Sequence, residues 1–230
     1  EAIKAFVDNK GRGLNITVHF KQQAWDIVDN HSERAKRAHA VNTIIVNPDN
    51  SLSGDNTDGL GMLADISTNH SIKIQGLDVL ILGAGGAVRG ILEPLIMANP
   101  QSINIVNRTV ERAHELAKNF SDLAVISSAS FEQLAGPQKY DLVINGTSAS
   151  LAGELPPLTN HILKPNACCY DMMYSDHKTV FVEWALAHGA TTALDGLGML
   201  VEQAAESFRL WRGVTPETRP VIQAVRDSLA

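Results

Sequence analysis

Residues 78–90 read DVLILGAGGAVRG, an apolar run of branched side chains that ends abruptly in glycines. Such a run predicts a buried parallel strand, a tight turn and the start of a helix. Gly83 and Gly85 stand where a dinucleotide-binding fingerprint has its first two glycines, which permit the turn and the close approach of a pyrophosphate. The third glycine position holds Val88. The stretch therefore predicts either a nucleotide site or an ordinary strand–turn–helix unit.

The chain that follows this stretch alternates between predicted strands and predicted helices. Short apolar runs recur at 103–106, 142–144 and 167–171, with helical patterns between them. This order predicts a doubly wound parallel sheet from about residue 77 to 195. The hydrophobic content is 44% and the aromatic content only 5%, which is typical of an aliphatic α/β core.

Composition narrows the classes of function. The formal net charge is −6, and no basic face indicates binding to nucleic acid or to an anionic membrane. No apolar run approaches the roughly 20 residues that cross a bilayer. The eight histidines are scattered without metal-ligand spacing. Cys168 and Cys169 are adjacent, which favours two reduced, buried thiols in a cytoplasmic protein.

A smaller unit precedes the sheet. Residues 14–20 alternate between apolar and polar side chains, which predicts a strand with one face on the core. Its polar face carries an amide, a hydroxyl and an imidazole, and Lys21 continues that series. Residues 41–46 predict a second strand. A polar, glycine-flanked loop follows at 54–59, and its two carboxylates indicate either a plain turn or a functional site.

Lys21 and Asp58 are the best candidates for proton chemistry. A lysine beside a carboxylate, partly removed from water, can act as an acid–base catalyst. Taken alone, a lysine in this position is most often a surface lysine. Gln203 is a further candidate, because it lies well off the apolar stripe of a helix predicted at 200–211, although a solvated position explains it too.

The second strand of the sheet indicates which nucleotide would bind. In an NAD site an acidic residue follows the glycines by about 20 positions and bonds the ribose. Asn107, Arg108 and Thr109 stand there instead, with Arg112 one helical turn later. Guanidinium groups bind phosphate in a planar, bidentate manner, so this pattern favours the 2′-phosphate of NADP. The same residues also fit an ordinary helix start with Thr109 as its N-cap.

Six motifs in this order resemble shikimate dehydrogenases over essentially the whole chain. They are NITVHFK at 15–21, AVNT at 40–43, GDNTDG at 54–59, GAGGA at 83–87, NRT at 107–109 and DGLGML at 195–200.

The resemblance implies an enzyme that reduces 3-dehydroshikimate to shikimate with NADPH, in aromatic amino-acid biosynthesis. It implies two α/β domains with the active site in the cleft between them. A smaller substrate domain would comprise residues 1–57 and 200–230. A Rossmann-like, NADP-binding domain would comprise residues 58–199.

The resemblance also assigns roles to individual residues. Lys21 and Asp58 would be the catalytic lysine and its paired aspartate, both in contact with substrate hydroxyls. The further substrate-binding positions would be Thr17, Asn42, Tyr174 and Gln203. The cofactor-binding positions would be Glu33, Gly83, Ala84, Gly85, Gly86, Ala87, Asn107, Arg108, Thr109, Arg112, Met172 and Gly196.

The chain departs from the family pattern in two places. His19 stands where the family usually has a proline before Phe-Lys, and a proline would fix φ before Lys21. The family's first strand–helix unit, with a Ser-x-Ser loop for the substrate carboxylate, has no match, so we expect that segment to be missing. Two alternatives remain: a quinate/shikimate dehydrogenase of broader specificity, or a non-catalytic NADP-binding module. We expect a monomer or a homodimer.

Overall fold

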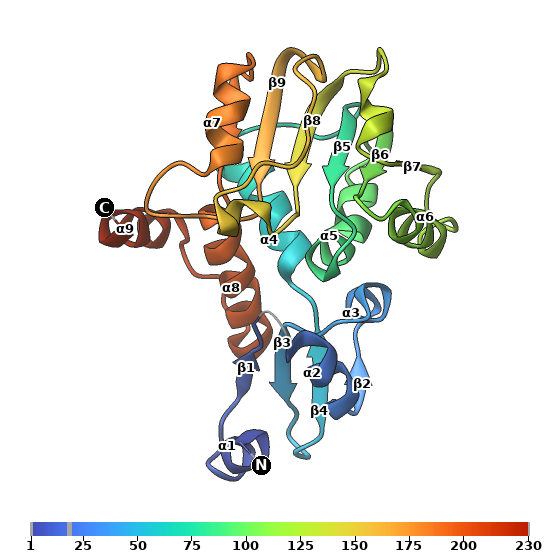
Figure 1. Ribbon diagram of the computed structural model, residues 1–230. Coiled ribbons are helices and arrows are strands. Elements are labelled where there is room, and N and C mark those ends of the chain that lie inside the picture. The colour runs from blue at the N-terminus through green and yellow to red at the C-terminus, as the bar shows by residue number, and fades with distance from the viewer. Residues whose placement is uncertain (1, 18–19, 230) are drawn as a thin grey trace.

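A computed structural model describes residues 2–17 and 20–229 of the chain. Figure 1 shows two bodies of unequal size with two helices running between them. The smaller body is built on a four-stranded sheet and the larger body on a six-stranded sheet.

The larger body confirms the predicted doubly wound parallel sheet. Its six strands all run parallel in the order β10-β9-β8-β5-β6-β7, which is the strand order of a Rossmann fold. The strands are β5 Asp78–Leu82, β6 Ser102–Val106, β7 Ile126–Ala129, β8 Tyr140–Asn145, β9 Leu163–Asp171 and β10 Thr192–Leu194. The order changes direction between β5 and β8, and ligands of such sheets bind in the crevice at that point.

Helices cover both faces of this sheet. They are α5 Gly86–Met97, α6 Val110–Asn119 and α7 Val180–Ala187, with short 3₁₀ turns η3 Glu132–Ala135 and η4 Ala149–Ala152. Successive strand residues point to opposite faces, so Ile81 packs against α5 while Leu82 packs on the side of α7. Cys168 and Cys169 divide between the faces in the same way, and neither forms a disulfide. Burial raises the pKa of the Cys168 thiol to about 12.

The smaller body has a mixed sheet in the order β1-β3-β4-β2, in which only β2 and β4 pair in parallel. Its elements are α1 Ala2–Asp8, β1 Gly13–Asn15, α2 Lys21–Ile27, β2 Asn30–His31, α3 Glu33–Ala38, β3 Thr43–Val46 and β4 Leu52–Asp55.

The predicted strand over 14–20 is wrong at residues 16, 17 and 20, because β1 ends at Asn15. Asn15 pairs with Thr43, where the partner strand β3 begins. One more backbone bond follows, from the N–H of Ile16 to the carbonyl of Asn42 at 2.7 Å. The chain then leaves the sheet, and Lys21 opens helix α2. Residues 18 and 19 lie outside the described part of the chain.

Two helices connect the bodies. Helix α4, Asp58–Ala64, leads out of the smaller body and continues as a π-helical turn, η2 Asp65–Asn69. Helix α8, Leu197–Arg212, runs back from the larger body to the smaller sheet (Figure 1). The loop predicted at 54–59 is therefore wrong at both ends, because Gly54 and Asp55 belong to β4 and Asp58 opens α4.

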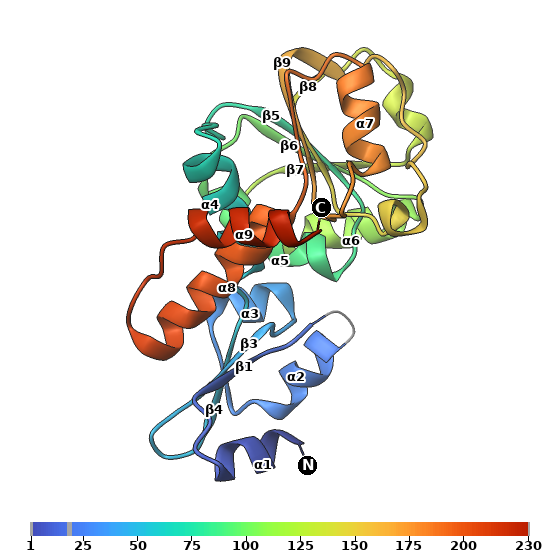
Figure 2. The same cartoon turned by 90° about the vertical axis from the view of Figure 1, so that its left-hand side faces the viewer.

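The last two helices differ from expectation. Helix α8 begins at Leu197 rather than at Leu200, and its predicted apolar stripe is only partly buried: Leu200 is 37% exposed and Phe208 42%. A further helix, α9 Arg219–Leu229, was not expected; in Figure 2 it crosses in front of α8. None of the described helices combines the length and apolarity that crossing a bilayer requires.

Candidate active site

A cavity of about 170 Å³ lies where the two bodies meet. The smaller body and α4 supply one part of its lining, and the loop after β9, the N-cap residue of α8 and α8 itself supply the rest. Its lining residues are Asn15, Ile16, Thr17, Lys21, Asn42, Asp58, Met172, Tyr174, Gly196, Met199, Leu200 and Gln203. The structure thus brings all six predicted substrate-binding residues to one cavity, together with Met172 and Gly196 from the predicted cofactor-binding set.

Lys21 and Asp58 form an ion pair at the wall of this cavity. Lys21 Nζ lies 2.5 Å from Asp58 Oδ2, and the two side chains are 23% and 8% exposed. Lys21 opens α2 and Asp58 opens α4, so each side chain projects from a helix start. The carboxylate is well placed there, because the N-terminal end of a helix favours negative charge. The pair joins a proton donor to a partner that orients it.

Asn42 holds the other oxygen of Asp58. Its Nδ2 donates to Asp58 Oδ1 at 2.8 Å, and its Oδ1 accepts from the Thr57 N–H at 2.9 Å and the Thr43 hydroxyl at 2.8 Å. These two donors fix which way the buried amide points. Asp58 therefore accepts a bond on each oxygen, and its carboxylate cannot rotate freely.

Gln203 approaches the same amide from α8. Its Oε1 lies 3.3 Å from Asn42 Nδ2, and its Nε2 donates to the carbonyl of Leu200 at 2.8 Å. Thr17 and Tyr174 complete the polar lining, and Tyr174 is 39% exposed. Hydroxyl, amide, ammonium and carboxylate groups therefore converge on a space of small-molecule size, which suits a polyhydroxylated ligand.

Asp171 organises the segment that carries Met172 and Tyr174. Its buried carboxylate accepts from Thr179 Oγ1 at 2.6 Å, Ser150 Oγ at 2.7 Å and the Met173 N–H at 3.1 Å. Burial raises the pKa of Asp171, while the two hydroxyl donors act in the opposite direction. The end of β9, and with it this wall of the cavity, is held by bonds at its last residue.

Asp55, the other carboxylate of the predicted loop, has a different environment. Arg34 Nη2 donates to Asp55 Oδ2 at 2.6 Å, and Ser32 Oγ donates to Oδ1 at 2.5 Å. The Asp55 side chain is only 7% exposed and does not line the cavity. Of the two carboxylates, only Asp58 is placed for proton chemistry.

The Arg34→Ala variant should lose stability and keep its turnover number. It leaves the Asp55 carboxylate buried without a cation, so we expect the free energy of unfolding to fall by about 2 kcal/mol or more. Urea unfolding measures this, with Lys36→Ala as the control, because Lys36 pairs with Glu33 on the surface. A fall in turnover at unchanged stability would contradict the structural role of Asp55.

The glycine turn fits a pyrophosphate. Gly83 has φ +103°, which side chains rarely adopt, and the space beside Gly85 and Gly86 is open. Helix α5 starts there with no side-chain cap and no acidic residue in its first turn, which leaves its first N–H groups for an anion. Val88, in the third glycine's place, packs against Gly146, where an added Cβ would clash with Val88 Cγ2. Gly146 at the end of β8 thus accommodates the larger residue.

The predicted 2′-phosphate residues follow β6, next to the glycine turn in the sheet. Arg108, Thr109 and Arg112 are exposed, and Asn107 Nδ2 donates to the carbonyl of Thr109 at 2.8 Å. Thr109 occupies the N-cap position of α6, but its hydroxyl makes no capping bond. Two guanidinium groups and a hydroxyl therefore stand at the carboxyl end of a strand, where the adenosine half of a dinucleotide would lie.

Glu33, a predicted cofactor-binding position, does not line the cavity. Glu33 lies in the first turn of α3, 78% exposed, where it accepts from Lys36 Nζ at 2.6 Å. That bond and the charge of Lys36 lower the pKa of Glu33. His19, the departure from the family's proline, lies outside the described residues.

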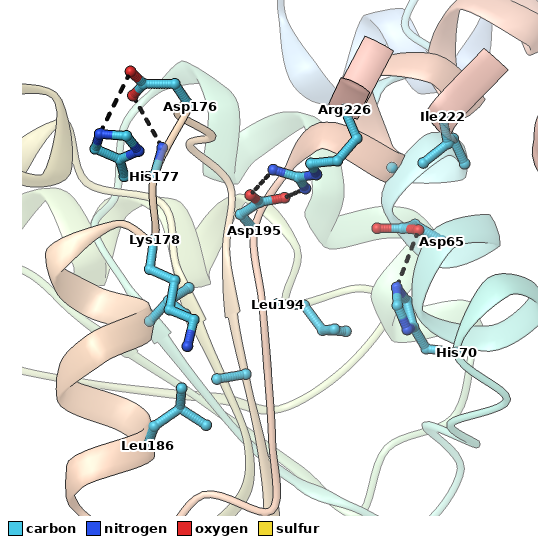
Figure 3. Close-up of a pocket in the computed structure, with 13 residues that line it drawn as sticks. Asp65, His70, Asp176, His177, Lys178, Leu186, Leu194, Asp195, Ile222 and Arg226 are labelled. Atoms are coloured by element: carbon cyan, nitrogen blue, oxygen red, sulfur yellow. Dashed lines mark hydrogen bonds and ion pairs between the residues drawn. The ribbon is translucent and has the colours of Figure 1, made fainter. Parts of the chain in front are cut away.

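A larger cavity, of about 390 Å³, lies beside the edge strand β10 and contains none of the predicted site residues. Figure 3 shows which of its ionisable groups face one another. Arg226 of α9 binds Asp195 at 2.6 and 2.8 Å, His70 faces Asp65 at 3.6 Å, and His177 faces Asp176. Asp195 also accepts from the Leu197 N–H at 3.2 Å, so α9 is tied to the start of α8.

Asn15 and Ser207 are two polar residues at the site that had no predicted role. Asn15 lines the cavity and donates to Ser207 Oγ at 3.0 Å. Ser207 is fully buried and lies 2.7 Å from the hydroxyl of Thr43. Asn15 could have been found, because it shares the polar face of the chain with Thr17. Ser207 gives no such signal, because its partners are distant in sequence.

Comparisons with known proteins point to the same family in three parts of the chain. Three family models match: "Shikimate dehydrogenase substrate binding domain" at residues 1–44, "Shikimate / quinate 5-dehydrogenase" at 63–153 and "Shikimate 5'-dehydrogenase C-terminal domain" at 196–226. A shikimate dehydrogenase (NADP(+)) of Alkalilimnicola ehrlichii is 56% identical over 225 residues, which are 98% of this chain and 82% of that protein.

Solved structures are similar as well. An Ael1 enzyme from Pseudomonas putida has a TM-score of 0.91 at 41% identity, over 97% of this chain and 81% of that one. The shikimate 5-dehydrogenase of Thermus thermophilus, in complex with NADP(H) and shikimate, has a TM-score of 0.84 at 31% identity, over 97% of this chain and 81% of that one.

Proposed function

This chain belongs to the shikimate dehydrogenase family, and from that premise we propose that it reduces 3-dehydroshikimate to shikimate with NADPH in the cavity between its two bodies. The observation that carries the proposal is the Lys21–Asp58 ion pair at the wall of that cavity. The named relatives favour this activity over the broader quinate/shikimate alternative.

The turn after β5 and the residues after β6 would hold the nucleotide. Gly83, Ala84, Gly85, Gly86 and Ala87 would receive the pyrophosphate at the start of α5, and Asn107, Arg108, Thr109 and Arg112 would hold the 2′-phosphate. NADPH, when bound, supplies the hydride that the carbonyl carbon accepts. Met172 and Gly196 reach the cavity from the larger body, which supports a place for them beside the nicotinamide. Glu33 stays a cofactor-side candidate on family resemblance alone.

Lys21 would donate the proton that the substrate oxygen needs. Its ammonium gives one N–H to Asp58, which leaves further N–H groups for a ligand in the cavity. Asp58 would hold the ammonium in place and accept a bond from a substrate hydroxyl, while Asn42 fixes the carboxylate. In the reverse direction the lysine, once deprotonated, would act as the base. Partial exclusion of water strengthens these interactions.

The remaining lining residues would hold the substrate ring. Thr17, Asn42, Tyr174 and Gln203 present hydroxyl and amide groups to the cavity, which suits the hydroxyl groups of shikimate. Residues 1–57 and 200–230 would form the substrate domain and residues 58–199 the NADP domain. The protein would act in the cytoplasm, which its two free buried thiols support. It would have no nucleic-acid partner, which its net charge of −6 supports. It would be a monomer or a homodimer.

A spectrophotometric assay tests the proposed activity. Oxidation of shikimate with NADP⁺ should raise the absorbance of NADPH, with a kcat/KM well above those for quinate or for NAD⁺. Comparable values with quinate would favour the broader enzyme. Absence of turnover with shikimate would refute the proposed activity.

A further inference from the structure

Helices α4 and α8 are in contact at Gly61 of α4, which faces Gln203 of α8. Gly61 is buried in α4, and a Cβ placed on it would lie 2.6 Å from the backbone nitrogen of Gln203 and 2.7 Å from its Cβ. These atoms belong to the backbone and the first side-chain carbon of Gln203, so they can move aside only if helix α8 moves. At Gly198, where α8 faces the end of α4, an added Cβ would likewise clash with the carboxylate of Asp65. The two helices therefore pack as closely as glycine allows.

This contact sets the span of the cavity. Gly61 lies one turn after Asp58 on α4, so the same short helix carries the catalytic carboxylate and the surface against which Gln203 rests. Asp58 is tethered by Lys21 and Asn42. Any increase in the distance between the helices would therefore move Gln203 away from the site, while the ion pair stays in place.

We propose that Gly61 is a positioning residue for substrate recognition, because its missing side chain brings Gln203 within reach of the ligand. The inference rests on the proposed function, in which Gln203 binds the substrate. It predicts that adding one methyl group at position 61 weakens shikimate binding without changing the nucleotide site.

The Gly61→Ala variant should raise the KM for shikimate about 10-fold or more, since displacement of a binding group by about 1 Å has effects of that size. The KM for NADP⁺ should stay within about twofold of wild type, and kcat should change less than the KM for shikimate. Gly136→Ala is the matched control, because Gly136 has ordinary φ and only one neighbour, at 3.8 Å from an added Cβ.

A double-mutant cycle separates positioning from general damage. If Gly61 acts through the Gln203 amide, Gly61→Ala should add nothing to the KM of Gln203→Ala. Equal losses in both backgrounds would overturn the proposal. So would an unchanged KM in Gly61→Ala when the wild type is active.

The Gln203→Asn variant provides a second test, which does not depend on whether Gly61→Ala folds. It shortens the side chain at fixed helix spacing, and we expect the KM for shikimate to rise as it does in Gln203→Ala. A wild-type KM in Gln203→Asn would refute the idea that helix spacing sets the reach. A wild-type protein inactive with shikimate would instead refute the proposed function, and this inference with it.

Discussion

Replacement of Lys21 by alanine should lower turnover about 10²-fold or more, with little change in NADPH affinity. The side chain is the donor closest to Asp58 in the cavity, at 2.5 Å, and none of the predicted nucleotide contacts involves it. Steady-state kinetics in both directions, with NADPH binding measured by fluorescence titration, would check this. Lys73→Ala serves as the control, because Lys73 is exposed and lies outside the cavity.

The same variant also removes the cation from a carboxylate that is 8% exposed, so loss of stability must be separated from loss of chemistry. Lys21→Met keeps the aliphatic stem, and adding Asp58→Asn removes the uncompensated charge. The double variant should regain stability over Lys21→Met and stay inactive. Near-normal turnover in Lys21→Ala would remove Lys21 from the mechanism.

Removal of both Arg108 and Arg112 should lower the preference for NADPH over NADH by about 10²-fold or more. Each guanidinium would make a charge-assisted bond to the 2′-phosphate, and such bonds contribute roughly 1.5–3 kcal/mol each. Both side chains are exposed at the carboxyl end of β6, so their loss leaves the core intact. The values of kcat/KM for NADPH and NADH measure the effect.

Two comparisons make the second prediction sharper. NADH lacks the 2′-phosphate, so its kcat/KM should be nearly unchanged in Arg108→Ala/Arg112→Ala. Arg219→Ala, at the exposed start of α9, should leave both values unchanged. If the double variant still prefers NADPH as strongly as the wild type does, the 2′-phosphate is held elsewhere.

The larger body was predictable because its signals are local. Strand β5 is buried on both faces, so it appears in the sequence as an unbroken apolar run, and Gly83 and Gly85 mark its end. The smaller body was harder to predict. The apolar–polar alternation over 14–20 continues beyond Asn15, where the pairing with β3 ends. The two-residue periodicity therefore predicted a strand that is too long. Helix α9 contains no buried residue, but Val221, Ile222, Val225 and Leu229 stand at helical spacing, so the sequence does hold a signal for this helix that the prediction left out.

The candidate site divides in a similar way. The proximity of Lys21 to Asp58 was expected from motifs, and the structure places the two side chains in contact; their catalytic role stays a prediction. The separate roles of Asp55 and Asp58 could not be read from a loop that contains both. The role of Asp55 depends on Arg34, which reaches it from α3. A pairing between separate segments produces no recognisable residue spacing in the sequence.

The bond from Asn15 to Ser207 joins positions 192 residues apart, and that from Thr43 to Ser207 joins positions 164 apart. By contrast, the six strands of the larger sheet follow one another between residues 78 and 194. Closing a long loop costs chain entropy before any contact compensates for it. During synthesis on the ribosome the strands of both sheets emerge before α8, whereas the contacts of Asn15 and Thr43 with Ser207 have to wait for that helix. The cavity therefore assembles only after α8 has emerged, because Met199, Leu200 and Gln203 of that helix line it.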